Sequence, residues 1–356
     1  MWNILFFLGA LLLLALSGCS GLGPGSVSRD RFDYTAALSD SWKDEMLLNI
    51  VKLRYGDAPV FLDVASIITQ YQLQGSLSLS GSWYANPTTL PAQVLGGQGT
   101  YSERPTITYS PLIGERFARS LMTPVPPSAI ISLIQAGYPA DLVFRLTVHS
   151  VNGLQNRYGG QSRARLADPR FYRLIELLRQ QQMSNAIGLR LDKIDQRTAS
   201  LLIIRGEADE EARVATQEIR HLLGLNPAAK ELRVVYGSVA KDDQEIAILS
   251  RSILDILVDL ASYIEVPAKH VAENRVNQTL PAENHAGKPL VPLLRIHNSP
   301  DKPGNAFIAV PYRDHWYWLD DRDINSKRGF SFLMFVFTLV ETGDKTPAPV
   351  VTIPTG

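Results

Sequence analysis

The sequence predicts a mixed α+β protein with a central β-α-β-β-α-β (ferredoxin-like) module over residues 141–237. Every second residue from Leu142 to Val148 is large and apolar, which is the period of a strand. Asp168-Pro169 then supplies a helix N-cap followed by proline at the first helical position, so we expect a helix from there to about residue 182. The segments that follow have the periods of strand, strand, helix and strand, at 187–194, 199–205, 208–223 and 231–236.

The region before this module, 35–140, begins with an amphipathic helix at 35–55. Its apolar residues Trp42, Met46, Ile50 and Leu53 recur at spacings of four, four and three. Residues 60–84 change to a period of two, which predicts either a strand pair or one long bent strand with a polar face. Glycine and proline then predict a long surface loop at 85–109, followed by short helices at 113–121 and 127–136.

The region after the module, 238–356, is predicted to begin with a helix at 243–264. Asp242 and Glu245 have the spacing of a capping box at its start. A polar loop at 265–290 should precede strands at 291–297, 305–311 and 315–319. The apolar run at 330–340 predicts a buried helix at 324–342, with a strand as the alternative because of its Phe and Val content.

Composition excludes several classes of protein. The chain has 356 residues, with 35 Lys+Arg against 35 Asp+Glu and a single cysteine. A balanced charge gives no electrostatic footprint for nucleic acid, so we expect no nucleic-acid partner. One cysteine excludes an internal disulfide framework and a cysteine-based zinc site.

Residues 1–18 have the properties of a signal peptide. The apolar stretch from Ile4 to Leu16 is too short to span a bilayer as a helix, which favours a signal over an uncleaved signal anchor, the alternative. The run ends in Leu16-Ser17-Gly18-Cys19, which resembles the lipobox of bacterial lipoproteins. The resemblance implies a diacylglyceryl group on the sulfur of Cys19, cleavage before it, and fatty acylation (palmitate) of the new N-terminus.

The same resemblance implies a location. Ser20 follows the cysteine, whereas lipoproteins retained in the inner membrane tend to have Asp there, so outer-membrane sorting and a periplasm-facing chain are implied. Residues 19–34 would be the lipidated tether. The segment from about Ile253 to Pro354 is also similar to that of uncharacterised lipoproteins of Gram-negative bacteria, and this similarity implies no activity.

The segment 313–323 is one candidate binding site. Arg313, His315, Trp316, Trp318, Asp320 and Asp321 concentrate aromatic and charged groups there. The aromatics could form a sugar platform, and Asp320 and Asp321 could serve as acid and base of a glycan hydrolase. Adjacent strand residues point to opposite faces, however, so an aromatic core strand followed by an acidic helix start is the simpler interpretation.

A second candidate is a cluster of arginines that includes Arg163, Arg165, Arg170 and Arg173. The planar guanidinium suits carboxylate and phosphate groups, so peptidoglycan or lipopolysaccharide are conceivable partners for an envelope protein. The alternative is a solvated helix and loop face.

Metal and cofactor sites are not expected. No pair of the six histidines shows the His-Glu-x-x-His spacing. His270 and Glu273 stand three apart in a predicted loop, where we expect them to be solvated polar residues. Acylation of Cys19 would also remove thiol catalysis. We therefore expect a non-enzymatic assembly, scaffold or interaction subunit of the envelope with a protein partner. The alternative is a glycan or peptidoglycan hydrolase, or a glycan-binding module, that uses 313–323.

Overall fold

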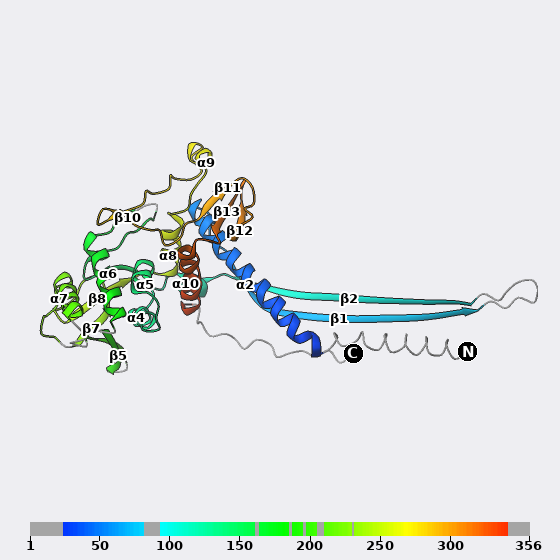
Figure 1. Cartoon of the computed structure of the whole chain (residues 1–356), viewed down its shortest axis with the longest axis horizontal. Coiled ribbons are helices and arrows are strands. Elements are labelled where there is room, and N and C mark those ends of the chain that lie inside the picture. Colours follow the sequence, from blue (N-terminus) through cyan, green and yellow to red (C-terminus); the bar gives the residue numbers. More distant parts are fainter. Residues whose placement is uncertain are drawn as a thin grey trace, which may run out of the picture. The chain divides into compact units, whose positions relative to one another are not determined.

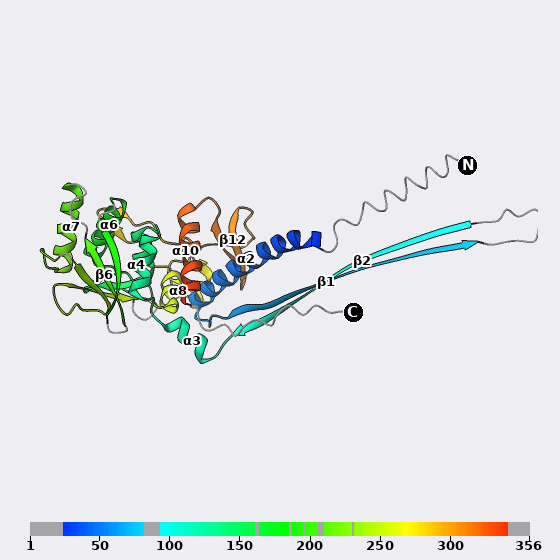
Figure 2. The same ribbon diagram turned by 90° about the horizontal axis from the view of Figure 1, so that it is seen from below.

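The protein is a mixed α and β chain that divides into two units. The computed structural model describes residues 24–81, 93–160, 164–184, 187–194, 197–204, 210–229 and 231–340. The first unit comprises 1–59 and 115–343, and the second contains 60–114. Figures 1 and 2 show the elements of both units, and the first unit holds every helix of the described residues.

Most predicted helices are confirmed. The described helices in the order of the chain are α2 (Pro24–Arg54), α3 (Glu115–Met122), α4 (Pro127–Gln135), α5 (Ala140–Thr147), α6 (Pro169–Met183), α7 (Glu210–Leu223), α8 (Ile253–Ala261), α9 (Ala268–Ala272) and α10 (Ile324–Val340). The side chain of Asp168 accepts a hydrogen bond from the backbone N–H of Arg170 at 2.9 Å, as an N-cap should. Helix α2 begins before the predicted start at 35, so residues 24–34 of the predicted tether are helical instead. In α2, Met46 and Ile50 are buried as predicted, while Trp42 remains 36% exposed.

The main sheet of the first unit has six strands in the order β4-β3-β8-β7-β6-β5. Their bounds are β3 (Val148–Val151), β4 (Leu154–Gln155), β5 (Ile187–Ile194), β6 (Arg197–Ile204), β7 (Glu231–Tyr236) and β8 (Glu245–Ser250). Within it, β7 and β8 are parallel and the other neighbours are antiparallel. The ferredoxin-like module is not confirmed, because β8, from outside the predicted module, separates β3 from β7.

The predicted strand at 142–148 is wrong, because most of this segment is helix α5. Pro139 lies at its N-cap, and Val143, Phe144, Leu146 and Thr147 are all buried. Residues three and four apart share one helix face, so these residues bury a continuous stripe. The alternating pattern therefore reflected a helix with a wide buried face, and the strand begins only at Val148.

The predicted helix at 243–264 is also wrong over its first half. Residues 245–250 form β8 in the sheet, and α8 begins only at Ile253. The capping box is made by Ser252 and Asp255 instead of Asp242 and Glu245: the backbone N–H of Asp255 donates to the Ser252 hydroxyl, and the N–H of Ser252 donates to the Asp255 carboxylate. A second, better cap further along the chain thus sets the start of the helix.

The second unit is a long hairpin of β1 (Phe61–Gly81) and β2 (Gln93–Leu112), paired antiparallel from Phe61↔Leu112 to Gly81↔Gln93. One continuous strand with an irregularity between Val64 and Ser66 matches the long bent strand predicted for 60–84. The loop predicted at 85–109 is wrong for the part that forms β2, because pairing along the hairpin overrides the glycine and proline content. A strand of 20 residues is about 65 Å long.

The C-terminal part of the first unit holds a small antiparallel sheet in the order β11-β13-β12. Its strands are β11 (His297–Ser299), β12 (Ala306–Tyr312) and β13 (His315–Asp320). The predicted loop at 265–290 contains α9 and the two-residue strands β9 (Asn284–His285) and β10 (Lys288–Pro289). The helix interpretation of the last apolar run is confirmed by α10, in which Phe330, Leu333 and Phe337 are buried. Among the described helices, none combines the length and hydropathy that crossing a membrane requires.

Candidate functional site

The predicted aromatic segment 313–323 forms the turn after β12, the whole of β13 and the turn that follows it. β13 is the central strand of its sheet, so it is hydrogen-bonded on both sides. Tyr317 and Leu319 are fully buried, because alternate residues of the strand face the core. This agrees with the interpretation of the segment as an aromatic core strand.

Trp316 and Trp318 lie on the other face of β13 and are half-buried. The ammonium of Lys302 lies 5.2 Å from the centre of the Trp316 ring, a cation–π distance. The His297 ring centre lies 4.9 Å from that of Trp318, with a tilt of 38°. Each half-buried indole ring therefore has a side chain of the same chain against it, which differs from the open platform that sugar binding needs.

Asp320 and Asp321 are both engaged in local contacts. The Asp320 carboxylate accepts a hydrogen bond from the backbone N–H of Arg322 at 2.9 Å. The Asp321 carboxylate forms a salt bridge of 2.6 Å with the ammonium of Lys327. These contacts close the turn between β13 and α10, and they account for both carboxylates without a substrate.

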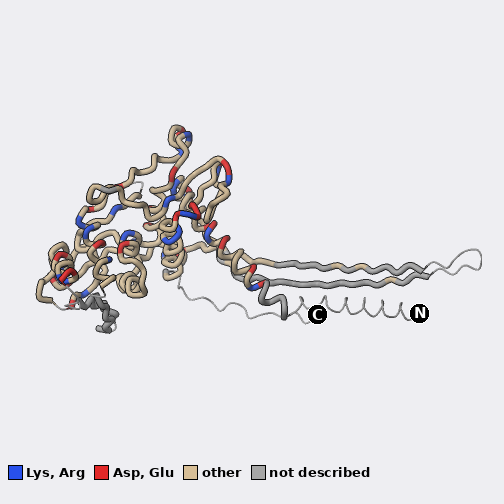
Figure 3. The backbone as a smooth tube through the Cα atoms, viewed as in Figure 1, with Lys and Arg blue, Asp and Glu red and all other residues tan. Residues whose placement is uncertain are grey.

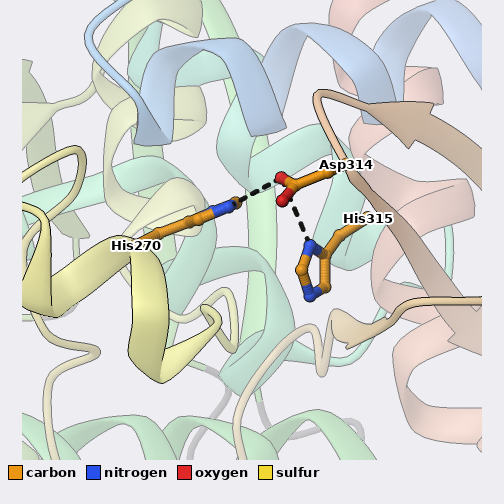
Figure 4. Close-up of side chains that lie close together, drawn as sticks. All are labelled: His270, Asp314 and His315. Atoms are coloured by element: carbon orange, nitrogen blue, oxygen red, sulfur yellow. Dashed lines mark hydrogen bonds and ion pairs between the residues drawn. The ribbon is translucent and has the colours of Figure 1, made fainter.

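The structure brings a different set of polar side chains together beside β13. His270 on α9, Asp314 in the β12–β13 turn and His315 at the start of β13 converge, as Figure 4 shows. The Nε2 of His270 lies 2.7 Å from the Asp314 carboxylate, and the Nδ1 of His315 lies 3.4 Å from the same oxygen. His270 is fully buried, His315 is largely buried and Asp314 is half-exposed. We call these three residues the His-Asp-His cluster.

Two tyrosines extend the cluster into the core. The hydroxyl of Tyr55, just after α2, lies 2.6 Å from the Nδ1 of His270 and 2.5 Å from the hydroxyl of Tyr317. A chain of hydrogen bonds thus runs from Tyr317 through Tyr55 and His270 to Asp314. Burial raises the pKa of Tyr55 and, together with the bond to Tyr55, that of Tyr317, so both phenols stay protonated.

Loss of water contact opposes ionisation of Asp314, but hydrogen bonds outweigh it. The backbone N–H of Asp314, the hydrogen bond to His270 and the nearby imidazole of His315 lower the pKa of Asp314 to about 2. This carboxylate is therefore an anion at neutral pH.

Arg313 closes the outer side of the cluster. Its guanidinium lies 4.8 Å from the centre of the Tyr55 ring and 3.8 Å from the Asp57 carboxylate, to which the hydroxyl of Tyr312 also donates. The backbone of Arg313 has a φ of 55°, the left-handed conformation that a tight turn between two strands requires. The carboxylate of Asp57 pairs with Arg313, so the carboxylate of Asp314 remains available to the two histidines.

The described arginines of the predicted cluster each interact with a different nearby group. Arg170 pairs with Asp168 at 2.7 Å, and Arg173 forms a fork with Glu218 at 2.6 and 2.7 Å. The Nε of Arg165 donates to the backbone carbonyl of Asn156 at 3.1 Å. Figure 3 shows basic and acidic residues interspersed over this part of the first unit. Arg163 and Cys19 lie outside the described residues.

His315 stands out in the sequence, but His270 and Asp314 do not stand out there as its neighbours. His270 and Asp314 are separated by 44 positions, and the contact depends on how α9 packs against the β12–β13 turn. The adjacent Asp314-His315 pair at the junction of two strands was the available signal.

Comparison of the chain with protein-family models, with curated proteins and with solved structures finds no match.

Proposed function

We propose that this chain is a lipid-anchored protein of the bacterial outer membrane that faces the periplasm and acts as a non-enzymatic interaction subunit. We further propose that it assembles with other copies of itself through the β1–β2 hairpin. The lipobox-like Leu16-Ser17-Gly18-Cys19 supports the anchor, and the hairpin supports the interaction.

The hairpin carries the proposal because it is a long two-stranded sheet. Within the described residues, neither β1 nor β2 pairs with a third strand. Each strand therefore presents a row of backbone N–H and C=O groups along its outer edge, which is a template for pairing with another strand. A two-stranded hairpin is at best marginally stable in water, so strands of 21 and 20 residues gain much from added strands.

The sequence of the hairpin favours a second copy as the partner. Residues 64–102 contain no Lys, Arg, Asp or Glu. Natural edge strands commonly use charged residues, above all Lys, to prevent pairing between identical molecules, because like charges opposite one another are destabilising. This hairpin lacks that protection over most of its length, so nothing electrostatic opposes the pairing of one copy with the next.

Photo-crosslinking in cells tests this assignment. A benzophenone amino acid at Ser78 in β1 or at Gln98 in β2, both exposed, should capture a neighbouring hairpin on irradiation. Two differently tagged copies of the chain are expressed together, so a covalent product that carries both tags identifies self-assembly. The matched control places the same amino acid at exposed Gln217 on α7, where no product with both tags is expected.

The outcomes separate the alternatives. Products with both tags from Ser78 and Gln98, but not from Gln217, support assembly of copies through the hairpin. A product at the hairpin that contains a different protein would contradict the second-copy assignment. Absence of any product at Ser78 and Gln98 would contradict the interaction role of the hairpin.

The lipid anchor is tested separately by Cys19→Ala. We expect loss of metabolic labelling with palmitate and a shift from the membrane fraction, because acyl chains contribute about 0.8 kcal/mol of membrane affinity per buried CH₂. Cys19→Ser, which also removes the thiol, should behave in the same way. A wild-type chain that takes up no palmitate would contradict the anchor.

We do not propose the hydrolase or glycan-binding alternative for 313–323. Asp320 and Asp321 make the local contacts described above, and Trp316 and Trp318 are covered by Lys302 and His297.

A further inference from the structure

We propose that the His-Asp-His cluster of His270, Asp314 and His315 binds a divalent transition metal ion of the zinc class. Each residue offers one ligand atom, and the three atoms lie within 4.8 Å of one another. The site lies wholly within the first unit and is independent of the hairpin and of the lipid anchor.

The donor set selects the class of metal. Two imidazole nitrogens and one carboxylate oxygen suit Zn²⁺ and its transition-metal neighbours, whereas Mg²⁺ and Ca²⁺ prefer oxygen ligands alone. Three protein ligands leave one tetrahedral position, which water can fill because Asp314 is half-exposed. The only cysteine of the chain is Cys19, so no thiolate from this fold competes for the site.

The distances are close to those of a ligand set. Two ligand atoms that lie about 2.0–2.1 Å from one tetrahedral zinc ion are about 3.3 Å apart. The Asp314 oxygen lies 2.7 Å from the His270 Nε2 and 3.4 Å from the His315 Nδ1. All three atoms lie within 4.8 Å of one another, so rotation of the two imidazoles towards each other would place them around one ion.

His315 adds a second, independent observation. Among the described residues, no hydrogen bond of normal geometry reaches its buried Nδ1 atom, and the Asp314 oxygen lies 3.4 Å away. A buried polar atom without a partner costs free energy, and such atoms are uncommon in folded proteins. A metal ion bound to this nitrogen would remove that cost, because the nitrogen would then serve as a ligand.

Tyr55 is placed to orient His270. Its hydroxyl lies 2.6 Å from the His270 Nδ1, the ring nitrogen that faces away from Asp314. When a metal takes the lone pair of Nε2, the ring proton lies on Nδ1, and the Tyr55 oxygen can accept it. Histidine ligands in metal sites characteristically make such a bond through their second nitrogen. Tyr55 would thus be a positioning residue held by Tyr317.

Zinc binding to the full-length, lipidated chain in detergent tests the proposal. The protein is purified without a polyhistidine tag, stripped with a chelator and titrated with Zn²⁺ by calorimetry. We expect one zinc ion per chain and no displacement by excess Mg²⁺. His315→Ala and Asp314→Asn should each weaken the affinity by more than about 100-fold, because loss of an outer-shell partner alone costs about 10–100-fold.

His297→Ala is the matched control. His297 pairs with Glu265 at 3.0 Å, so it has a histidine and a carboxylate but belongs to no described three-ligand group. We expect His297→Ala to bind zinc as the wild type does. Failure of the wild type to bind zinc, or equal affinity of the His315→Ala and His297→Ala variants, would overturn the proposal.

A separate measurement tests whether Tyr55 positions His270. Co²⁺ in place of Zn²⁺ absorbs visible light with a spectrum that depends on its ligands. Tyr55→Phe should weaken binding about 10-fold and change the Co²⁺ spectrum, whereas Tyr236→Phe, at an exposed tyrosine of β7, should change neither. If His315→Ala does not fold, Asp314→Asn still decides the result, because Asp314 is half-exposed. A spectrum without nitrogen ligands would contradict the assignment.

Discussion

The guanidinium of Arg251 lies 3.0 Å from the carboxylate of Asp259, and the two side chains are only 1% and 3% exposed. The second oxygen of Asp259 accepts the backbone N–H of Gly159 at 2.6 Å, and Arg251 also donates to the backbone carbonyls of Arg145 and Arg157. One buried ion pair therefore ties together the end of α5, the segment 157–159 and α8.

Removing one partner of this buried ion pair should strongly destabilise the protein. Arg251→Met leaves the Asp259 carboxylate buried without its cation, so we expect the free energy of unfolding to fall by about 3–5 kcal/mol. Urea unfolding followed by tryptophan fluorescence measures the change. The control is Arg233→Met, which breaks an exposed pair with Asp242 and should cost less than about 1 kcal/mol. Equal losses in the two variants would contradict the structural role of Arg251.

The same region should not tolerate a methyl group at Gly159. A Cβ atom there would lie 1.9 Å from the hydroxyl oxygen of Ser262. We expect Gly159→Ala to destabilise the protein by about 1–3 kcal/mol, and Ser262→Gly in the same chain to recover part of the loss. Gly304→Ala is the control, because a Cβ at Gly304 meets nothing within 4 Å. A thermal shift assay compares the variants, and a Gly159→Ala protein as stable as Gly304→Ala would show that the close approach is absent.

Asp255 should make stability depend on acid pH. The imidazole of His149, whose Nε2 lies 3.7 Å from the Asp255 carboxylate, and hydrogen bonds from Ser252, acting against burial, lower the pKa of Asp255 to about 2 from 3.8. Because the folded pKa lies below the unfolded value, the stabilisation is complete above about pH 4. It is lost as the pH falls towards 2.

Asp255→Asn removes that dependence and weakens the capping box. We expect the variant to be less stable than the wild type by about 1 kcal/mol at pH 6, with the difference shrinking between pH 4 and pH 2. Urea midpoints across this range measure it. Asp301→Asn, at an exposed position before β12, should show no such convergence. A difference that stays constant from pH 6 to pH 2 would contradict the account.

Local signals in the sequence were enough to predict the elements whose ends are marked by nearby residues. Asp168-Pro169 predicted the start of α6, because a helix cap acts within a few residues, and the period of residues 208–223 predicted α7. The start of α8 was missed because two capping boxes competed, and only the packing of β8 into the sheet decides between them.

Long-range pairing explains the remaining errors. β2 contains Pro105 and several glycines that predict a loop, yet it pairs with β1 along its whole length. Both strands are edge strands in the described sheet, where the missing N–H of a proline is tolerated. The His-Asp-His cluster was hidden for a similar reason, because His270 reaches Asp314 only through the packing of α9, which no sequence period encodes.

The central claim is that copies of this chain assemble through the hairpin, and the mass of the purified, lipidated protein in detergent tests it most directly. Native mass spectrometry should give a multiple of the mature chain for the wild type. It should give a single chain for the double variant Gln98→Lys/Thr100→Lys, because lysines on a strand edge oppose pairing of identical copies. The control Gln217→Lys/Gln278→Lys adds the same charge at exposed positions of the first unit and should remain assembled. A wild type that is a single chain, or a hairpin variant that assembles as well as the control, would contradict the claim.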